Sequence, residues 1–138
     1  NILMSLFKIK PGTPSVEEFL SLSGSVEMGT RSLEGVKKGL GNELFGALLY
    51  HRDSGELVGM GRVVGDGGTV FHICDMVVKP EWQKKGGGTM IMDSLMGFIE
   101  GLGISDAYVN LIADVDGFYE KWGFKHTRPR SKGMFLKS

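Results

Sequence analysis

The sequence predicts an α/β protein of the α+β type, with a mixed, mostly antiparallel central sheet and flanking helices. Two patterns predict this fold class. The first half of the chain holds short apolar segments separated by glycine-containing turns, which is typical of an antiparallel meander. In the second half, apolar segments alternate between strand-like and helical periodicity, which indicates strand–helix–strand units.

The first half of the chain contains four predicted strands and two predicted helices. Ser15 followed by Glu18 has the spacing of a capping box, which predicts a short helix over 16–24. Ser32 is a second candidate N-cap, for a helix that ends before Gly41. Apolar, β-branched and aromatic residues bounded by turn residues predict the strands, which are 3–10, 42–51, 57–65 and 69–78.

The second half begins with a helix. Apolar residues at helical spacing after a run of glycines predict it, and it ends before Gly103; they are Ile91, Leu95, Phe98, Ile99 and Leu102. Asp114 is a candidate N-cap and Gly123 a candidate terminator of a short last helix. Further strands are predicted at 106–113, 124–127 and 133–137. We therefore expect about six to seven strands and about four helices in a single domain covering residues 1–138.

Composition narrows the functional classes. The 16 Lys and Arg residues balance the 16 Asp and Glu residues, so neither nucleic acid nor an anionic membrane is an expected partner. The single cysteine, Cys74, excludes an intrachain disulfide and fits a reducing compartment, so we expect a cytoplasmic protein. No apolar segment is long enough to span a bilayer, and the opening NILMSLFKIK lacks the basic leader and cleavage site of a signal peptide.

Three consecutive glycines stand where a strand gives way to a helix, in the segment KPEWQKKGGGT. The first turn of a helix leaves backbone N–H groups without partners, and these groups attract anions. Glycine lets a phosphate approach the backbone closely, and Lys84 and Lys85 add positive charge. The segment therefore predicts a pyrophosphate site, although a glycine-rich helix start without a ligand fits it equally well. Neither the P-loop pattern nor G-x-G-x-x-G is present.

Two motifs resemble the GCN5-related N-acetyltransferase (GNAT) superfamily. After Pro80, the residues Gln83, Gly86, Gly88 and Thr89 match the acetyl-coenzyme A signature of that family. The later segment VNLIADVDGFYEKWGF, residues 109–124, resembles the strand and Phe-Tyr motif of the family. In that segment Asp114 stands where relatives usually have Asn, and Gly117 where they have Ala. The two motifs occur in the expected order and separation.

The resemblance implies an N-acetyltransferase that moves an acetyl group from acetyl-CoA directly to a primary amine through a tetrahedral intermediate. It implies that backbone N–H groups of residues 84–89 bind the pyrophosphate. It also implies that the pantetheine arm pairs with the strand near Met76, at a β-bulge, and contacts Asp114. The implied cofactor-binding residues are Met76, Val77, Val78, Gln83, Lys84, Lys85, Gly86, Gly87, Gly88, Thr89, Asp114 and Tyr119.

The candidate catalytic residues are Tyr119 and Asp75. Tyr119 matches the tyrosine that protonates the departing thiolate in many relatives, and packing beside Phe118 is its alternative role. Asp75 is a charged residue inside an apolar strand, which fits either a base for the amine or an ion-pair partner of Arg62. His72 is the second candidate base, with an ordinary half-buried strand histidine as the alternative. No metal is expected, because no further ligands follow His72 at metal spacing.

The expected acceptor is a small-molecule amine, because the chain is compact and electrically neutral. A protein or peptide N-acetyltransferase is the second interpretation. A non-catalytic acyl-CoA-binding module is the third, and the intact Tyr119 disfavours it. Relatives are often homodimers, and the resemblance is compatible with a homodimer.

Overall fold

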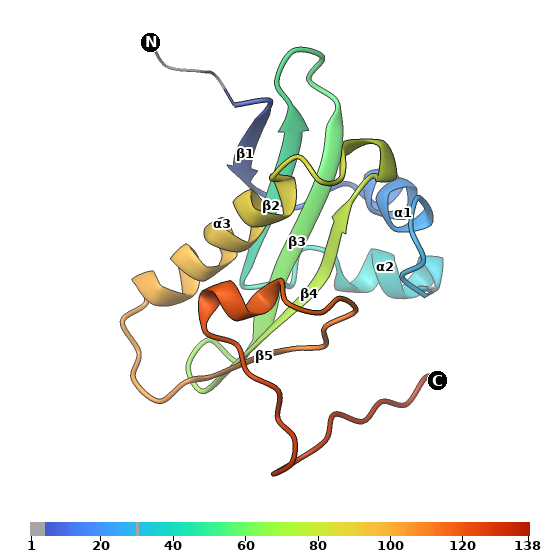
Figure 1. Ribbon diagram of the computed structural model, residues 1–138. Helices are drawn as coiled ribbons and strands as arrows, with labels where there is room; N and C mark the ends of the chain where they lie inside the picture. The colour runs from blue at the N-terminus through green and yellow to red at the C-terminus, as the bar shows by residue number, and fades with distance from the viewer. Residues whose placement is uncertain (1–4, 30) are drawn as a thin grey trace.

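A five-stranded sheet forms the centre of the computed structural model, which describes residues 5–29 and 31–138 (Figure 1). The strands lie side by side in the order of the sequence and are β1 (Phe7–Pro11), β2 (Phe45–His51), β3 (Leu57–Gly65), β4 (Val70–Val78) and β5 (Tyr108–Leu111). Each of the first four strands pairs antiparallel with its sequence neighbour, whereas β5 pairs parallel with β4. The sheet is therefore mixed.

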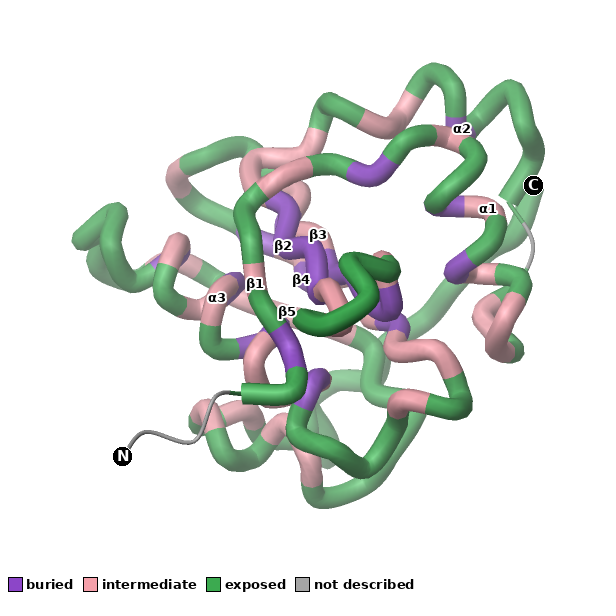
Figure 2. Tube along the Cα trace, turned by 90° about the horizontal axis from the view of Figure 1, so that it is seen from above, coloured by how far each residue is buried: buried purple, intermediate pink, exposed green. Residues whose placement is uncertain are grey.

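Helices cover both faces of this sheet. The α-helices are α1 (Val16–Gly24), α2 (Leu33–Gly39) and α3 (Gly87–Gly101), and the 3-10 helices are η1 (Pro80–Trp82) and η2 (Tyr119–Trp122). The helix α3 packs on one face, while α1 and α2 pack on the other (Figures 1 and 2). Among the residues described, no helix combines the length and the apolar character needed to cross a bilayer.

Local sequence accounts for the starts of the two N-terminal helices. The Ser15 hydroxyl accepts a hydrogen bond from the Glu18 N–H, and the Glu18 carboxylate accepts one from the Ser15 N–H, which confirms the predicted capping box. The Ser32 hydroxyl accepts from the Gly35 N–H at the start of α2, so the second predicted N-cap is also confirmed.

Two apolar clusters form the core. The cluster between α3 and the sheet contains Phe7, Ala47, Leu49, Val58, Val63, Phe71, Ile73, Ile91, Met92, Leu95 and Ile99. The cluster under α1 and α2 contains Phe19, Leu22, Val36, Leu48, Met60 and Val77. A Cβ atom on Gly61 would lie 2.7 Å from Cγ2 of Ile91, so a glycine in β3 allows α3 to approach the sheet closely. The buried strands appear as the purple centre of Figure 2.

The number of elements differs from the prediction. Within residues 5–29 and 31–138 there are five strands and three α-helices, against the six to seven strands and four helices expected. The segments 124–127 and 133–137 form no strand, and Leu3 and Met4 of the first predicted strand lie outside the described residues. The exposed fractions of Met134, Phe135 and Leu136 are 92%, 93% and 91%. A short apolar segment forms a strand through pairing and burial, and this one has neither.

The last predicted helix is also wrong. Only the 3-10 helix η2 forms there, with Phe118 at its N-cap, and Asp114 does not cap it. Gly117 interrupts the segment with a φ of 79°, a left-handed conformation that ends helical geometry. Gly123 follows η2 with a φ of 91°, as expected for the predicted terminator.

Candidate active site

The three consecutive glycines at the start of α3 differ in what surrounds them. Gly86 is the N-cap, with a left-handed φ of 88°, and a Cβ atom there would project into open space. Gly87 is buried, and a Cβ atom on it would lie 2.6 Å from Cδ2 of Leu49. A Cβ atom on Gly88 would lie 3.3 Å from the Phe118 ring. The loop is therefore open at Gly86, whereas Gly87 and Gly88 allow close packing.

The loop before α3 presents backbone donors without acceptors. In the part of the chain that the structure describes, the N–H groups of Lys84, Lys85 and Gly86 have no acceptor. The first-turn N–H groups of α3, up to Thr89, have no partner within the helix either. The side chains of Lys84 and Lys85 are exposed and form no ion pair with a described residue. This combination of donors and positive charge is suited to a diphosphate.

Two contacts fix this loop to the sheet. The Gln83 side-chain amide donates a hydrogen bond of 2.8 Å to the Val78 carbonyl at the end of β4. The Trp82 ring contacts the rings of Phe7 and His51, whose centroids are 6.1 Å and 4.3 Å away. Gln83 was predicted to bind the cofactor, and the structure shows that its amide nitrogen already has a partner within the protein.

The strand β4 contains a β-bulge at Asp75 and Met76. Met60 pairs with Val77 and Arg62 pairs with Cys74, so two residues of β4 lie opposite Gly61 alone. Asp75 has a φ of 56°, a left-handed conformation that Asp adopts more readily than most residues. The position of the bulge agrees with the prediction made from the resemblance.

The bulge reverses which side chains face α3. Before it, Phe71 and Ile73 pack into the cluster beneath α3, and after it Met76 and Val78 pack against that cluster. The Asp75 carboxylate is directed to the other face, where it meets Arg62. A regular strand could not place these side chains in this way, because its alternation has a period of two.

The outer edge of β4 is open beyond the bulge. The strand β5 pairs with β4 only from Val70 to Ile73, and β4 continues to Val78. No strand in the described chain lies beside the later part of that edge. Backbone groups that point to this edge are therefore available to an extended ligand, with the exception of the Val78 carbonyl, which accepts from Gln83. Met76, Val77 and Val78, predicted to bind the pantetheine arm, all lie on this part of β4.

Tyr119 lies on η2, next to the start of α3. The ring of its neighbour Phe118 lies against Gly88, and the Trp122 indole donates a hydrogen bond of 2.9 Å to Asp93 on α3. The structure thereby brings together the two sequence motifs, which are far apart in the chain. Burial, and to a smaller degree the negative charge of Asp114, raises the pKa of Tyr119 above its ordinary value. The phenol therefore stays protonated at neutral pH, as a general acid must.

Asp75 is engaged in ion pairs. It is 6% exposed, its Oδ2 atom accepts from Arg62 Nε at 2.9 Å, and its Oδ1 atom accepts from Arg31 Nη2 at 3.2 Å. The predicted alternative of a pair with Arg62 is therefore confirmed. Both oxygens already accept from guanidinium groups, so the structure favours a positioning role for Asp75 at the bulge over the role of a base.

The ion pairs continue through Arg62 to Glu43, in the loop before β2. The Nη1 atom of Arg62 lies 2.9 Å from Oε1 of Glu43, and this oxygen also accepts from the Gly41 N–H. The other carboxylate oxygen, Oε2, accepts from the Thr13 hydroxyl. Burial alone would raise the pKa of Glu43, but the hydrogen bonds from Thr13 and Arg62 outweigh burial and lower it. Sequence reasoning missed Arg31 and Glu43, because loop residues without a motif carry no signal beyond the need of Asp75 for cations.

A second polar contact links β4 to β5. Nδ1 of His72, on β4, lies 2.6 Å from Oδ1 of Asn110, on β5. Cys74 lies two residues after His72 on the same strand, and burial raises the pKa of its thiol to about 11. No group of three or more His, Cys, Asp or Glu side chains in the described chain could hold a metal ion.

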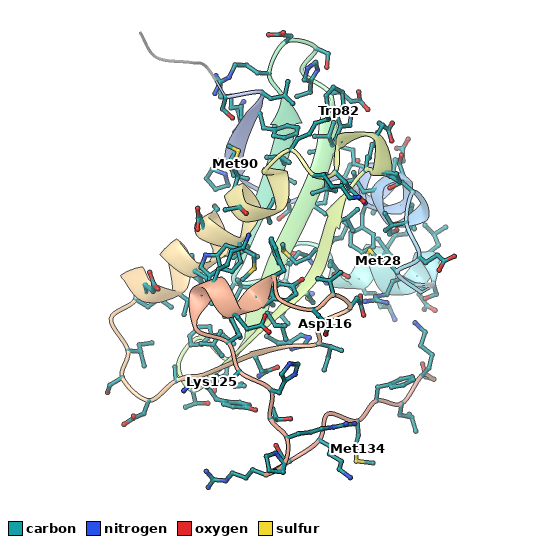
Figure 3. All side chains as sticks on the ribbon, viewed as in Figure 1. Met28, Trp82, Met90, Asp116, Lys125 and Met134 are labelled. Atoms are coloured by element: carbon teal, nitrogen blue, oxygen red, sulfur yellow. The ribbon has the colours of Figure 1, made fainter. Side chains whose placement is uncertain are left out.

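A hollow of about 720 Å³ lies between β5 and the C-terminal segment. Tyr119 and Phe124 line it from η2 and the residues after it, and Met134 and Phe135 line it from the tail. Figure 3 shows Met134 on the extended tail, away from the sheet. Tyr119 therefore lines this hollow, while its neighbour Phe118 lies against Gly88 at the start of α3.

Comparison with known families shows the family to which this chain belongs. The model of the acetyltransferase (GNAT) domain matches residues 36–135, most of the chain. The chain belongs to the GNAT acetyltransferase family. An uncharacterised N-acetyltransferase of Pyropia yezoensis, ycf52, is 32% identical over 120 residues, which cover 86% of this chain and 69% of the relative. The family membership predicted from the two motifs is thus confirmed.

Solved structures agree with the GNAT assignment. A Staphylococcus aureus protein named a probable acetyltransferase has 40% sequence identity and a TM-score of 0.89, covering 96% of this chain and 99% of its own. A GNAT family acetyltransferase from Streptococcus pneumoniae has 27% identity and a TM-score of 0.77, covering 96% and 98%. N-acetylglutamate synthase from Neisseria gonorrhoeae, solved with coenzyme A and N-acetyl-glutamate, shares the fold at 17% identity and a TM-score of 0.64, covering 88% of this chain and 28% of its own.

Proposed function

We propose that this GNAT protein transfers an acetyl group from acetyl-CoA to the primary amine of a small molecule. One observation carries the proposal: a loop of unpartnered N–H groups, at 84–89, lies at the end of an unpaired strand edge on β4. The first feature suits a diphosphate and the second suits the amide-containing arm of the same cofactor. The coenzyme A found in a distant GNAT structure supports the choice of cofactor.

The residues present fit this cofactor. A Cβ atom at Gly86 would occupy the open space next to the unpartnered N–H groups, and Gly86 has none. Lys84 and Lys85 supply charge for further phosphate, and the β4 edge from Met76 to Val78 supplies backbone partners for the arm. Asp114 lies in the segment between β5 and η2, where it would face the arm.

Acetyl-CoA would supply the acetyl group as a thioester. A backbone N–H at the bulge, near Met76, would donate to the carbonyl oxygen, where negative charge develops during attack by the amine. Tyr119 would give its hydroxyl proton to the sulfur as the carbon–sulfur bond breaks. The raised pKa of Tyr119 keeps that proton available throughout the neutral range.

A small molecule is the proposed acceptor because the domain is compact and its charges balance. In this proposal neither nucleic acid nor a membrane is a partner, and the protein is compatible with a homodimer. A protein or peptide N-acetyltransferase is the second candidate, and an acyl-CoA-binding module without activity is the third. The position of Tyr119 on η2, directly after Phe118, which lies against Gly88, favours an enzyme over the module.

Release of free thiol from acetyl-CoA separates these functions. The protein would be assayed with a polyamine, an amino sugar, an amino acid and a lysine-containing peptide. Turnover with a small amine and slower turnover with the peptide is the expected result. Turnover with the peptide alone would support the second candidate, and calorimetric binding of acetyl-CoA without turnover on any amine would support the module.

A further inference from the structure

We propose that His72 is the general base that takes the proton from the acceptor amine, and that Asn110 positions it. The proposal rests on the transferase function proposed above. Its starting point is that the ion pairs of Asp75 leave that carboxylate without a free oxygen.

The hydrogen bond to Asn110 fixes the protonation pattern of the imidazole. Nδ1 of His72 lies 2.6 Å from the amide oxygen Oδ1 of Asn110, and an amide oxygen can only accept. Nδ1 therefore carries the hydrogen and donates it. The lone pair of the neutral ring is then on Nε2, the nitrogen with no partner among the described residues. A neutral imidazole held in this tautomer presents the free acceptor atom that a general base needs.

His72 lies where β4 and β5 separate. It pairs with Asn110 in the parallel ladder, and the last pair, Ile73 with Leu111, is one residue further on. Because Phe71 and Ile73 point toward α3, His72 points to the opposite face, the one that carries the Asp75 ion pairs. His72 and Asp75 are three residue steps apart along the strand, roughly 10 Å, a distance that the acceptor and one bridging water can cover.

Other charged or titratable groups on this face are less suited to the task. Cys74 is next to His72 on the same face, and its pKa of about 11 keeps the thiol protonated. Arg62 and Arg31 are cations engaged with Asp75. Glu43 accepts from Arg62, Thr13 and the Gly41 N–H, which together hold it as a carboxylate. His72 has a free acceptor atom and no ion pair with a described residue.

The proton balance is complete. Nε2 of His72 takes one proton from the ammonium form of the acceptor, and the neutral nitrogen then attacks the thioester carbon. A carbon–nitrogen bond forms, the carbon–sulfur bond breaks, and the sulfur receives a proton from Tyr119. The second proton lost by the nitrogen restores the Tyr119 phenol, and the imidazolium of His72 releases its proton to water.

The pH dependence of kcat/KM tests the proposal, with the fastest small amine of the panel as acceptor. Wild type should lose activity as the pH falls, because the protonated imidazole cannot accept a proton. His72→Gln should lower kcat/KM by roughly 10²-fold and remove that acidic limb. Its affinity for acetyl-CoA by calorimetry should stay unchanged. Cys74→Ser, on the same strand face, should retain both rate and limb.

Asn110→Asp should shift the pH profile of kcat/KM, which would not shift if Asn110 had only a structural role. A carboxylate beside the imidazole stabilises the protonated ring, so the acidic limb should move to higher pH. Nitrogen-15 shifts of the imidazole, which need no turnover, should show the hydrogen on Nδ1 in wild type and lose this preference in Asn110→Ala.

Three outcomes would overturn the proposal for His72: a His72→Gln enzyme with the wild-type rate and acidic limb, an Asn110→Asp enzyme with an unmoved limb, or a ring with its hydrogen on Nε2. In these cases the wild-type enzyme would still be active, so the transferase function would stand. No thiol release by wild type with any amine would overturn both proposals.

Discussion

Tyr119 is the residue whose environment is most clearly suited to a chemical step. Replacing it with Phe removes the hydroxyl and retains the ring that packs against Phe118 and Phe124. We expect Tyr119→Phe to lower kcat by roughly 10²-fold with little change in acetyl-CoA affinity, because a general acid acts on the leaving group and not on binding.

The dependence of activity on pH also tests the role of Tyr119 as the acid. The raised pKa of Tyr119 places the loss of the phenol proton above its ordinary value of 10.0, so wild-type activity should fall only at pH values beyond that. Steady-state kinetics of wild type and Tyr119→Phe would measure this, with Tyr108→Phe, 58% exposed, as the control. Equal turnover of wild type and Tyr119→Phe at every pH would exclude Tyr119 as the acid.

Arg62 is the residue on which the buried ion pairs depend. Its side chain is 15% exposed and joins Asp75 to Glu43, whose side chains are 1% and 4% exposed. Arg62→Met should lower the free energy of unfolding by about 3 kcal/mol, because it leaves buried carboxylates without their shared cation.

The control for Arg62 is an exposed pair. Glu34 and Lys38 form an ion pair on α2 with side chains 79% and 77% exposed. Glu34→Gln should change the free energy of unfolding by less than ~0.5 kcal/mol. Urea denaturation would measure both variants, and equal losses would show that burial does not matter to these pairs.

At the scale of one element, neighbouring glycines at the start of α3 have different roles, one in binding the cofactor and the other in packing. Gly86→Val should lower acetyl-CoA affinity by at least roughly tenfold, because the side chain fills the phosphate approach and strains a positive φ. Gly87→Ala should instead lower the free energy of unfolding by about 1–3 kcal/mol, since its Cβ meets Leu49.

Gly97 offers a control on the same helix. A Cβ atom there meets nothing within 4 Å, so Gly97→Ala should raise the free energy of unfolding by about 0.5–1 kcal/mol and leave affinity unchanged. Calorimetry and thermal denaturation on all three variants would check the pattern. Wild-type affinity in Gly86→Val would exclude the loop as the phosphate site.

The success of the sequence predictions also differs by element. Both N-caps are visible in sequence because Ser15 and Ser32 act on residues three positions away. The requirement for Gly87 is not visible, because it depends on Leu49 of a distant strand. The predicted strands at 124–127 and 133–137 fail for the same reason: strand formation needs a partner elsewhere in the molecule.

At the scale of the whole molecule, the site is assembled from segments that local patterns cannot relate. The two sequence motifs predicted the loop at 84–89 and Tyr119 as site residues. The position of the Phe118 ring against Gly88 shows that the two motifs lie together in the fold. No motif predicted a role for Arg31, Glu43 or Asn110. Their contacts with Asp75, Arg62 and His72 depend on how loops and strands pack around β4. The exposed course of the apolar tail, for which a strand was predicted, and the hollow beside β5 likewise could not be anticipated from sequence.

The central claim is that coenzyme A lies against the loop before α3 and along the open edge of β4. A titration with coenzyme A, followed by amide nitrogen–proton correlation spectra, tests it over the whole chain at once. The account predicts the largest shifts at 84–89 and at Met76–Val78, with small shifts in α2. Saturable binding with its largest shifts along the hollow beside β5, or no binding, would contradict it.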